Sequence, residues 1–242
     1  MIRINELTKR YGTVTALDHL NLHIRDGELF ALLGVNGAGK TTTIKLLSCL
    51  SQPSSGSVQI DEHDVQQEPI EVKKIIAVSP QQTAVAPNLT VQENLELICG
   101  VHGYSSAASR EMTKEMIESF GLGEIASFRA KTLSGGWQRR LSIAMALISR
   151  PKVLFLDEPT LGLDVLARRE LWNVIKQLKG RITIVLTTHY LEEAEALCDR
   201  IAVMAKGKLC AIGTVDELKA RTGTDSLEKA FIALNEKGGE VV

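Results

Sequence analysis

The amino-acid sequence predicts an α/β protein whose parallel sheet is interrupted by one helical insertion. Four short apolar runs are typical of strands buried on both faces of a parallel sheet, at residues 28–34, 153–156, 182–186 and 201–204. Helical patterns separate the later runs, as expected of βαβ units. Residues 91–149 contain no comparable run and read as several helices, so we expect a helical insert in the α/β core.

The elements before the insert are mostly strands. Residues 2–7 and 20–24 alternate apolar and polar side chains, which is typical of half-buried strands. The buried run at 28–34 follows an Asp-Gly turn signal, and a helix is expected directly after it at 40–49. A further alternating strand is expected at 56–61, after a cluster of turn residues.

Helices predominate in the insert and at the end of the chain. Two are expected at residues 91–101 and 109–120. Another is expected after Gly136, where apolar residues recur at helical spacing and form one stripe: Leu141, Ala144, Met145 and Ile148. A helix at 214–221 opens with a capping-box spacing, and the tail beyond Gly223 has room for one more.

Composition and charge exclude several functional classes. The 242 residues are 44% hydrophobic and 24% charged, which argues against global disorder. A net charge of −1 with 4% aromatic residues is unlike a protein that coats nucleic acid, so no nucleic-acid partner is expected. No run of about 18 apolar residues predicts a spanning helix. The four cysteines form no close pairs, so we expect an intracellular protein without a zinc site or disulfides.

A glycine-rich segment between a strand and a helix predicts a phosphate site. Residues 34–41, the phosphate loop, read Gly-Val-Asn-Gly-Ala-Gly-Lys-Thr and fit the pattern Gly-x4-Gly-Lys-Thr. Glycines let backbone N–H groups approach phosphate oxygens, and the following helix start adds free donors and a positive dipole. Lys40 would neutralise the β- and γ-phosphates, and the Thr41 hydroxyl would hold Mg²⁺. The motif alone does not distinguish an NTPase from a kinase.

Two acidic residues follow another buried run. Asp157 and Glu158 come directly after the apolar residues 153–156. An acid at the carboxyl end of a strand, beside a phosphate loop, is placed to organise Mg²⁺, and we assign this role to Asp157. Glu158 points elsewhere and is our candidate general base for an attacking water. The alternative is a pair of surface acids that cap a turn.

A second glycine segment predicts another anion site. Ser134, Gly135 and Gly136 precede an expected helix, and Ser134 is well placed as its N-cap. The two glycines bring bare N–H groups to a helix start. Because one ATP needs a single phosphate loop, this second helix start suggests a site that another copy of the chain completes.

Together these motifs resemble those of the nucleotide-binding subunits of ABC transporters. The phosphate loop, Leu133-Ser-Gly-Gly and Leu156-Asp-Glu-Pro occur in that order, and the resemblance covers about residues 1–220. It implies a P-loop NTPase (RecA-like) core with an N-terminal antiparallel β subdomain and an inserted helical subdomain. The implied boundaries are 1–222 for the nucleotide-binding domain, about 86–150 for the helical subdomain and 223–242 for a short C-terminal tail.

The resemblance implies further site residues. Tyr11 resembles the aromatic residue that stacks on adenine. Gln81 resembles the glutamine that contacts Mg²⁺ and the attacking water; Gln82 adjoins it, and the spacing to residues 89–95 favours Gln81. Asp164 resembles a residue of the loop that crosses the dimer interface, and His189 resembles the histidine that contacts the γ-phosphate.

The implied cofactors are ATP and Mg²⁺. The implied catalytic residues are Lys40, Gln81, Glu158 and His189. The implied ATP contacts are Tyr11, Asn36, Gly37, Ala38, Gly39, Lys40, Thr41 and Thr42, and in trans Ser134, Gly135 and Gly136. The implied Mg²⁺ ligands are Thr41, Gln81 and Asp157.

The resemblance also implies a function. It describes an ATP-hydrolysing motor subunit that pairs with a second such subunit, identical or different, around two ATP molecules and drives a separate integral membrane permease. Such a subunit would be cytoplasmic and held on the inner face of the cell membrane by the permease, which the family docks near residues 76–95.

Export is the favoured branch of the family. Residues 225–232 resemble the tail of exporter ATPases that handle drugs, antibiotics, lipids and polysaccharides, so a drug, peptide or lipid-like substrate is expected. The alternatives are an importer ATPase and a non-transport ATPase of the translation-factor or DNA-repair type. A single set of motifs and the lack of sustained heptads speak against the non-transport types.

One residue departs from the family's pattern. Trp137 stands where glutamine is commonest, and we expect its indole to pack on the neighbouring subunit. The basic pairs at 73–74, 139–140 and 168–169 are interpreted as solvated faces. The acidic run at 192–195 is interpreted as a helix start, where the helix dipole favours negative charge, and neither feature is given a function.

Overall fold

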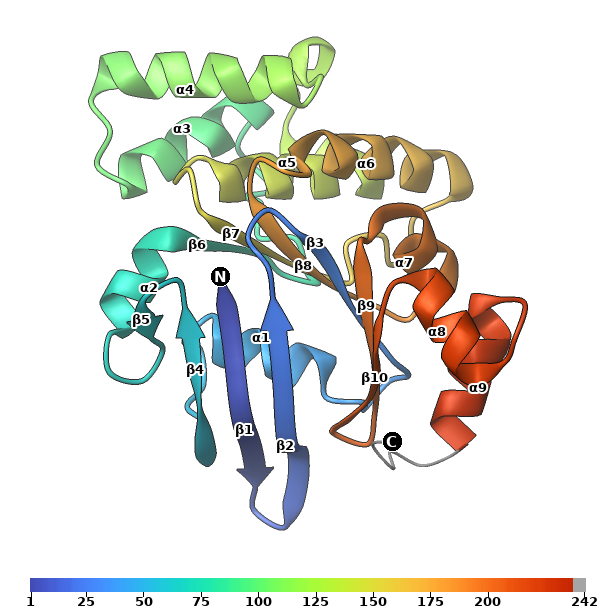
Figure 1. Cartoon of the computed structure of the whole chain (residues 1–242). Helices are drawn as coiled ribbons and strands as arrows, with labels where there is room; N and C mark the ends of the chain where they lie inside the picture. Colours follow the sequence, from blue (N-terminus) through green and yellow to red (C-terminus); the bar gives the residue numbers. More distant parts are fainter. Residues whose placement is uncertain (237–242) are drawn as a thin grey trace.

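In the computed structural model, which describes residues 1–236, strands form two sheets with helices around the larger one (Figure 1). The strands are β1 (Ile2–Tyr11), β2 (Val14–Ile24), β3 (Leu29–Leu33), β4 (Ser55–Ile60), β5 (His63–Asp64), β6 (Ile76–Ser79), β7 (Val153–Asp157), β8 (Thr183–Thr188), β9 (Arg200–Ala205) and β10 (Lys208–Gly213). The helices are α1 (Lys40–Leu47), α2 (Pro69–Ile75), α3 (Val91–Val101), α4 (Ser106–Ser119), α5 (Gly135–Leu147), α6 (Val165–Leu178), α7 (Leu191–Leu197), α8 (Val215–Thr222) and α9 (Leu227–Glu236). The expected tail contains α9, and its last six residues lie outside the described residues.

The larger sheet has six strands in the order β10-β9-β3-β8-β7-β6. All neighbouring pairs are parallel except β9 and β10, which are antiparallel. The four runs expected to be buried strands are β3, β7, β8 and β9, which confirms the parallel sheet. Every residue of β3, β7 and β8 is buried because both faces of the sheet are covered. The strands β6 and β10 are not expected from the sequence.

The two faces of the larger sheet belong to different hydrophobic cores. Alternate residues of a strand point to opposite faces. In β3, Leu29 and Ala31 pack in the core that contains most of the helices, whereas Phe30 and Leu32 pack in the core shared with α1 and the smaller sheet. Complete burial of a side chain such as Phe30 contributes about 1.5–3 kcal/mol. The continuous apolar run in the sequence therefore reflects two cores that both need this strand.

The smaller sheet is antiparallel and comes from the first part of the chain. Its strand order is β2-β1-β4-β5, which confirms the expected N-terminal antiparallel β subdomain. β1 and β2 are longer than the alternating pattern predicts. The register of the β1–β2 pair shifts between Ile4 and Leu7 and again between Leu7 and Lys9, and such shifts interrupt the alternation of faces.

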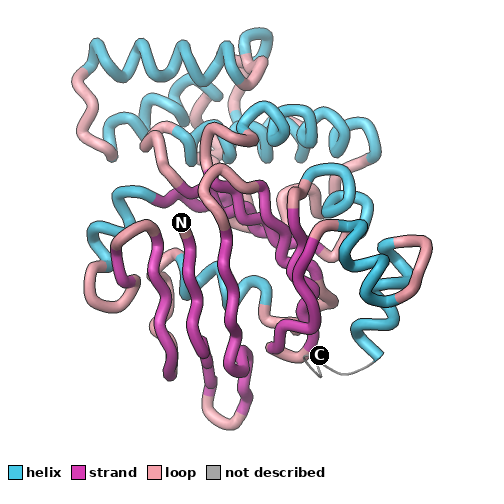
Figure 2. Tube along the Cα trace, in the orientation of Figure 1, coloured by secondary structure: helices cyan, strands magenta, loops and turns pink. Residues whose placement is uncertain are grey.

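Three helices, α3, α4 and α5, lie between β6 and β7 and confirm the expected helical insert. Figure 2 shows α4 at the top of the view, and it packs on α3 and α5. α4 begins three residues earlier than expected because the Oγ of Ser105 accepts a hydrogen bond from the N–H of Ala108 at 3.3 Å and caps the helix. Within residues 1–236, no helix combines the length and the apolar character needed to cross a membrane.

Candidate functional site

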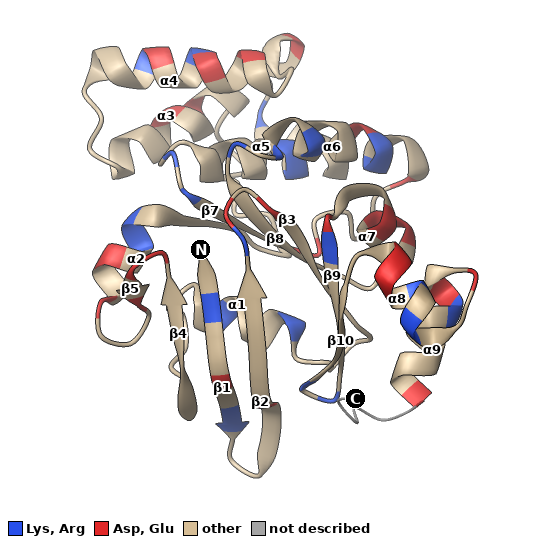
Figure 3. Ribbon diagram, viewed as in Figure 1, with Lys and Arg blue, Asp and Glu red and all other residues tan. Residues whose placement is uncertain are grey.

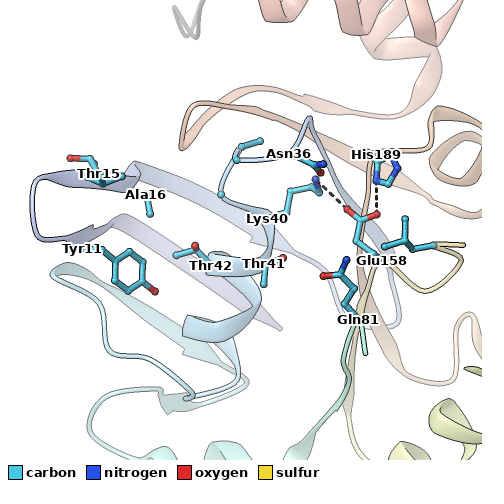
Figure 4. A pocket seen from close by; sticks show the side chains of 15 residues that line it. Tyr11, Thr15, Ala16, Asn36, Lys40, Thr41, Thr42, Gln81, Glu158 and His189 are labelled. Carbon is cyan, nitrogen blue, oxygen red and sulfur yellow. Dashed lines mark hydrogen bonds and ion pairs between the residues drawn. The ribbon is translucent and has the colours of Figure 1, made fainter. Parts of the chain in front are cut away.

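The carboxyl ends of four neighbouring strands bring most of the expected site residues together. β3 leads into the phosphate loop, β7 ends at Asp157, His189 follows β8, and Gln81 lies two residues beyond β6. The carboxyl ends of parallel strands meet at one edge of a sheet, where α/β proteins bind ligands. Residues of the phosphate loop, Gln81, His189 and Glu158, the residue after Asp157, line a pocket of about 420 Å³ (Figure 4). Its full lining is Tyr11, Val14, Thr15, Ala16, Asn36, Gly37, Ala38, Gly39, Lys40, Thr41, Thr42, Gln81, Glu158, Leu161 and His189.

The phosphate loop has the backbone of an anion site. Gly39 has a φ of 103°, and a Cβ there would lie 2.6 Å from the Cδ2 of Leu17, so this position requires glycine. α1 begins at the next residue, and no side chain caps it in the described structure. The first amide groups of α1 are therefore available to phosphate oxygens.

Lys40, Glu158 and His189 form a row of polar contacts in the pocket (Figure 4). The Nζ of Lys40 lies 3.3 Å from Oε1 of Glu158, and Oε2 of Glu158 lies 2.7 Å from Nδ1 of His189. Lys40 also donates to the carbonyl of Gly34 at 2.7 Å. Lys40 and Glu158 are almost fully buried, so solvent screens their attraction weakly.

The backbone of Glu158 explains why its side chain leaves the line of the strand. Its φ is 49°, in the left-handed region that residues other than glycine rarely adopt, at a cost of about 1–3 kcal/mol. Its N–H donates to both the carbonyl and the Oγ1 of Thr187, at 3.1 and 3.0 Å, and these bonds hold the turn. This turn of the backbone gives Asp157 and Glu158 the separate orientations that the sequence predicts.

Asp157 lies behind the pocket beside Thr41. Its Oδ1 accepts hydrogen bonds from the Oγ1 of Thr41 at 3.2 Å and from the Oγ1 of Thr187 at 2.5 Å. A hydroxyl and a carboxylate oxygen are ligands that Mg²⁺ prefers, and Gln81 adds an amide oxygen to the same pocket. The residues present therefore fit a magnesium ion.

Gln81 is held in place by Arg139, whose burial the sequence did not predict. Arg139 is 5% exposed, and its guanidinium donates to the carbonyls of Pro80 and Gln81. The interpretation of residues 139–140 as a solvated face is wrong for Arg139. A basic pair on an expected helix carries no signal of which member is buried. Gln82 does not line the pocket, whereas Gln81 does.

Ser134, Gly135 and Gly136 lie outside this pocket. They begin α5, and Ser134 occupies the N-cap position as expected, but its side chain makes no capping hydrogen bond. Ser134 and Gly136 line a second pocket of about 250 Å³ together with Asp164, which caps α6 through the N–H groups of Leu166 and Ala167. A Cβ on Gly136 would lie 3.0 Å from that of Ala167, so α5 and α6 approach closely here. Within one chain, the two sets of expected ATP contacts therefore lie in two different pockets.

The remaining expectations concern surface residues. Tyr11 is 48% exposed at the edge of the first pocket, with Nζ of Lys9 4.8 Å from its ring centre. Its neighbours Val14, Thr15 and Ala16 line the pocket as well, although no motif pointed to them. Lys73 and Lys74 are exposed, as expected. The acidic run lies at the start of α7, as expected, and Glu193 within it is fully buried.

The fold and the first pocket define a P-loop nucleotide-binding domain. Comparisons with known proteins narrow this class. The family model described as ABC transporter matches residues 17–161. The chain is 43% identical over 227 residues to the daunorubicin/doxorubicin resistance ATP-binding protein DrrA of Streptomyces peucetius, a match that covers 93% of this chain and 69% of DrrA.

A second relative is much longer than the chain. The probable multidrug ABC transporter ATP-binding protein YbhF of Escherichia coli is 40% identical over 240 residues, which cover 97% of this chain and 41% of YbhF. The chain therefore spans less than half the length of that relative.

Solved structures of ATP-binding domains have the same fold as the chain. The structure of an ATP binding subunit of an ABC transporter superposes with a TM-score of 0.85 at 29% identity, covering 97% of this chain and 99% of that one. A dimeric post-hydrolysis state of the ATP-binding cassette MJ0796, bound to ADP and Pi, superposes with a TM-score of 0.78 at 28% identity, covering 88% and 98%. The chain belongs to the ABC transporter family and contains its ATP-binding domain, which in this family is an ATPase.

Proposed function

We propose that the chain is the ATP-hydrolysing motor subunit of an ABC transporter that exports a drug, peptide or lipid-like substrate through a separate permease. The observation that carries the proposal is the division of the site. One pocket holds Lys40, Glu158 and His189, while Ser134 and Gly136 line a different one. A second subunit, identical or different, would bring its own Ser134–Gly136 segment to the first pocket and enclose ATP.

The geometry supports specific roles in hydrolysis. The phosphates of ATP would compete with Glu158 for the ammonium of Lys40, which lies 3.3 Å from that carboxylate. Released from Lys40, Glu158 would accept the proton of the attacking water, with His189 holding the other carboxyl oxygen or the γ-phosphate. Mg²⁺ at Thr41, Gln81 and Asp157 would neutralise phosphate charge. ATP bound from both sides would favour the closed dimer, and loss of the γ-phosphate would favour the open one.

A small groove supports docking of a permease near the predicted segment. It has a volume of about 240 Å³, lies between β6, α3 and α5, and is lined by Ile76, Ala77, Val78, Pro80, Ala84, Ile98, His102, Ser142, Met145, Ala146 and Ser149. Two apolar side chains at the end of α3, Leu97 and Val101, are exposed nearby. We propose that a permease binds here and holds the chain at the inner face of the membrane.

The names of several relatives favour export. Those of DrrA and YbhF refer to drug resistance and multidrug transport, and their similarity extends over at least 93% of this chain. The exporter-like residues of the tail include Leu227 and Ala230, which are buried in α9. An importer ATPase subunit is the second candidate, because membership of the ABC transporter family does not by itself give the direction of transport. The identity of the membrane subunit that co-purifies with the chain distinguishes them.

Substitution of the candidate base tests the proposal. Glu158→Gln keeps the shape of the side chain but cannot accept a proton, so we expect ATP binding to persist while turnover falls at least about a hundredfold. In the presence of ATP this variant should then form a stable dimer, whose mass is measured by light scattering after gel filtration. Glu118→Gln, at an exposed position on α4, is the control and should retain wild-type turnover. Wild-type turnover in Glu158→Gln would remove Glu158 from the role.

A further inference from the structure

A carboxyl group outside the proposed chemistry lies buried between two helices. Glu193, in the first turn of α7, is 0% exposed. Its Oε1 accepts a hydrogen bond from the indole Nε1 of Trp172 on α6 at 3.2 Å. Its Oε2 is buried and makes no hydrogen bond of normal geometry with any residue in 1–236.

A buried carboxyl group of this kind lowers the stability of the fold, so its presence calls for a role other than stabilisation. Burial raises the pKa of Glu193 above its usual value, and the nearby hydroxyls of Thr188 and Thr160 and the indole of Trp172 offset this rise only in part. A buried polar group with incomplete hydrogen bonding typically destabilises a fold relative to an apolar side chain of similar size. The steps assigned to Lys40 and Glu158 do not use it.

The two helices that Glu193 joins lead to different halves of the composite site. α6 begins directly after Asp164, which lines the pocket of Ser134 and Gly136. α7 begins two residues after His189, which lines the ATP pocket. Figure 1 shows α6 and α7 next to each other, and Figure 3 shows Lys and Arg along α6 and Asp and Glu on α7.

A second contact joins the same helices on the same side. The guanidinium of Arg168 lies 4.6 Å from the ring centre of Tyr190, and that ring lies 4.2 Å from the ring of His189. Arg168 and Trp172 are four residues apart, so they share a face of α6. Arg168 also approaches Glu192 at 3.9 Å, but this carboxylate is 83% exposed and adds little.

We propose that Glu193 is a positioning residue that, through Trp172, holds the His189 segment in register with α6 and thereby with Asp164. The inference rests on the proposed function, because it concerns where His189 stands when a second subunit reaches the α6 start. A shift of α7 along α6 moves Tyr190, which is packed between Arg168 and His189. His189 then leaves its 2.7 Å contact with Glu158.

Activity measurements give the first test. Glu193→Ala and Trp172→Phe each remove the hydrogen bond and should lower kcat for ATP hydrolysis about tenfold, with less change in KM, because misplacement of a catalytic group affects the transition state most. The double variant should be no worse than the poorer single variant. Glu193→Gln retains the acceptor and the shape and should keep more than half of the wild-type kcat. Leu197→Ala, a substitution of another buried residue on α7, is the control for a general loss of packing around this helix.

A spectroscopic test needs no turnover. The imidazole ¹⁵N signals of His189, assigned by their loss in His189→Gln, should shift in Glu193→Ala and Trp172→Phe but not in Glu193→Gln or Leu197→Ala. Unmoved signals in Glu193→Ala, or equal shifts in Leu197→Ala, overturn the inference. If the wild-type chain hydrolyses no ATP, the proposed function fails, whereas the His189 signals still decide this inference.

Discussion

Arg139 supports the nucleotide pocket without lining it. Its buried guanidinium holds two consecutive carbonyls, those of Pro80 and Gln81, on the segment that follows β6. Burial lowers the pKa of Arg139, and the nearby charges of Asp157 and Glu193 raise it. Arginine suits this position because its planar fork donates several hydrogen bonds at once and stays charged when buried.

The stability of the chain should depend on this side chain. Arg139→Met fills a similar volume but leaves two carbonyls without their charged donor, so we expect the free energy of unfolding in urea to fall by about 2–4 kcal/mol. Arg150→Met is the matched control, because that guanidinium is 70% exposed in its ion pair with Glu115 and should contribute about 0–1 kcal/mol. Equal losses of unfolding free energy in the two variants would show that the buried Arg139 contributes no more to stability than an exposed arginine.

At the scale of an element, the start of α5 is the feature with most consequence. α5 packs on α6 through the close approach of Gly136 and Ala167, and through an ion pair of 3.0 Å between Arg140 and Glu170. The guanidinium of Arg140 also lies 4.4 Å from the ring centre of Trp137. The indole also packs against the hydrophobic core, and it remains partly exposed where it lines the second pocket.

Trp137 should report closure of the dimer. If the indole packs on the neighbouring subunit, its emission should change in wavelength or intensity when ATP drives dimerisation, because its contact with water changes. The measurement uses a Trp172→Phe background, in which Trp137 is the one remaining tryptophan. Adding ADP, which lacks the bridging γ-phosphate, is the control and should leave emission unchanged. A dimer that forms without any change at Trp137 would contradict the packing.

At the scale of the whole molecule, each chain holds the parts of two half-sites. Its phosphate loop and its Ser134–Gly136 segment open into different pockets. In a head-to-tail pair, each complete site would therefore need one part from each subunit. The proposed arrangement would give the Ser134–Gly136 segment a role although one ATP needs only one phosphate loop.

Mixing two inactive chains tests this arrangement. Lys40→Ala disables the phosphate loop and Ser134→Arg disables the other half-site, so each chain alone should be inactive. A mixed dimer retains one intact site, and an equal mixture should recover about a quarter of wild-type ATPase activity, since about half of the dimers are mixed. A mixture of Lys40→Ala with Glu158→Gln restores no complete site and is the control. Lack of recovery in the first mixture would contradict composite sites.

Strands β3, β7, β8 and β9 were predictable because burial on both faces demands apolar residues at every position, a pattern that survives in the linear chain. Strand β6 was not, because four residues between a helix and Pro80 leave no period to detect, and only pairing with β7 makes them a strand. The full length of β1 was not predictable either, because its register shifts interrupt the alternation of apolar and polar residues.

The residues of the phosphate loop, with Asp157, Glu158 and Ser134–Gly136, could be read from the sequence because phosphate binding needs fixed residue types at fixed local spacing. The burial of Arg139 and Glu193 was decided by tertiary structure alone. Whether a charged side chain on a helix faces water depends on which distant elements pack against it, here the segment after β6 and helix α6. Local sequence therefore determined the chemistry of the pocket, and packing determined which further side chains hold it in place.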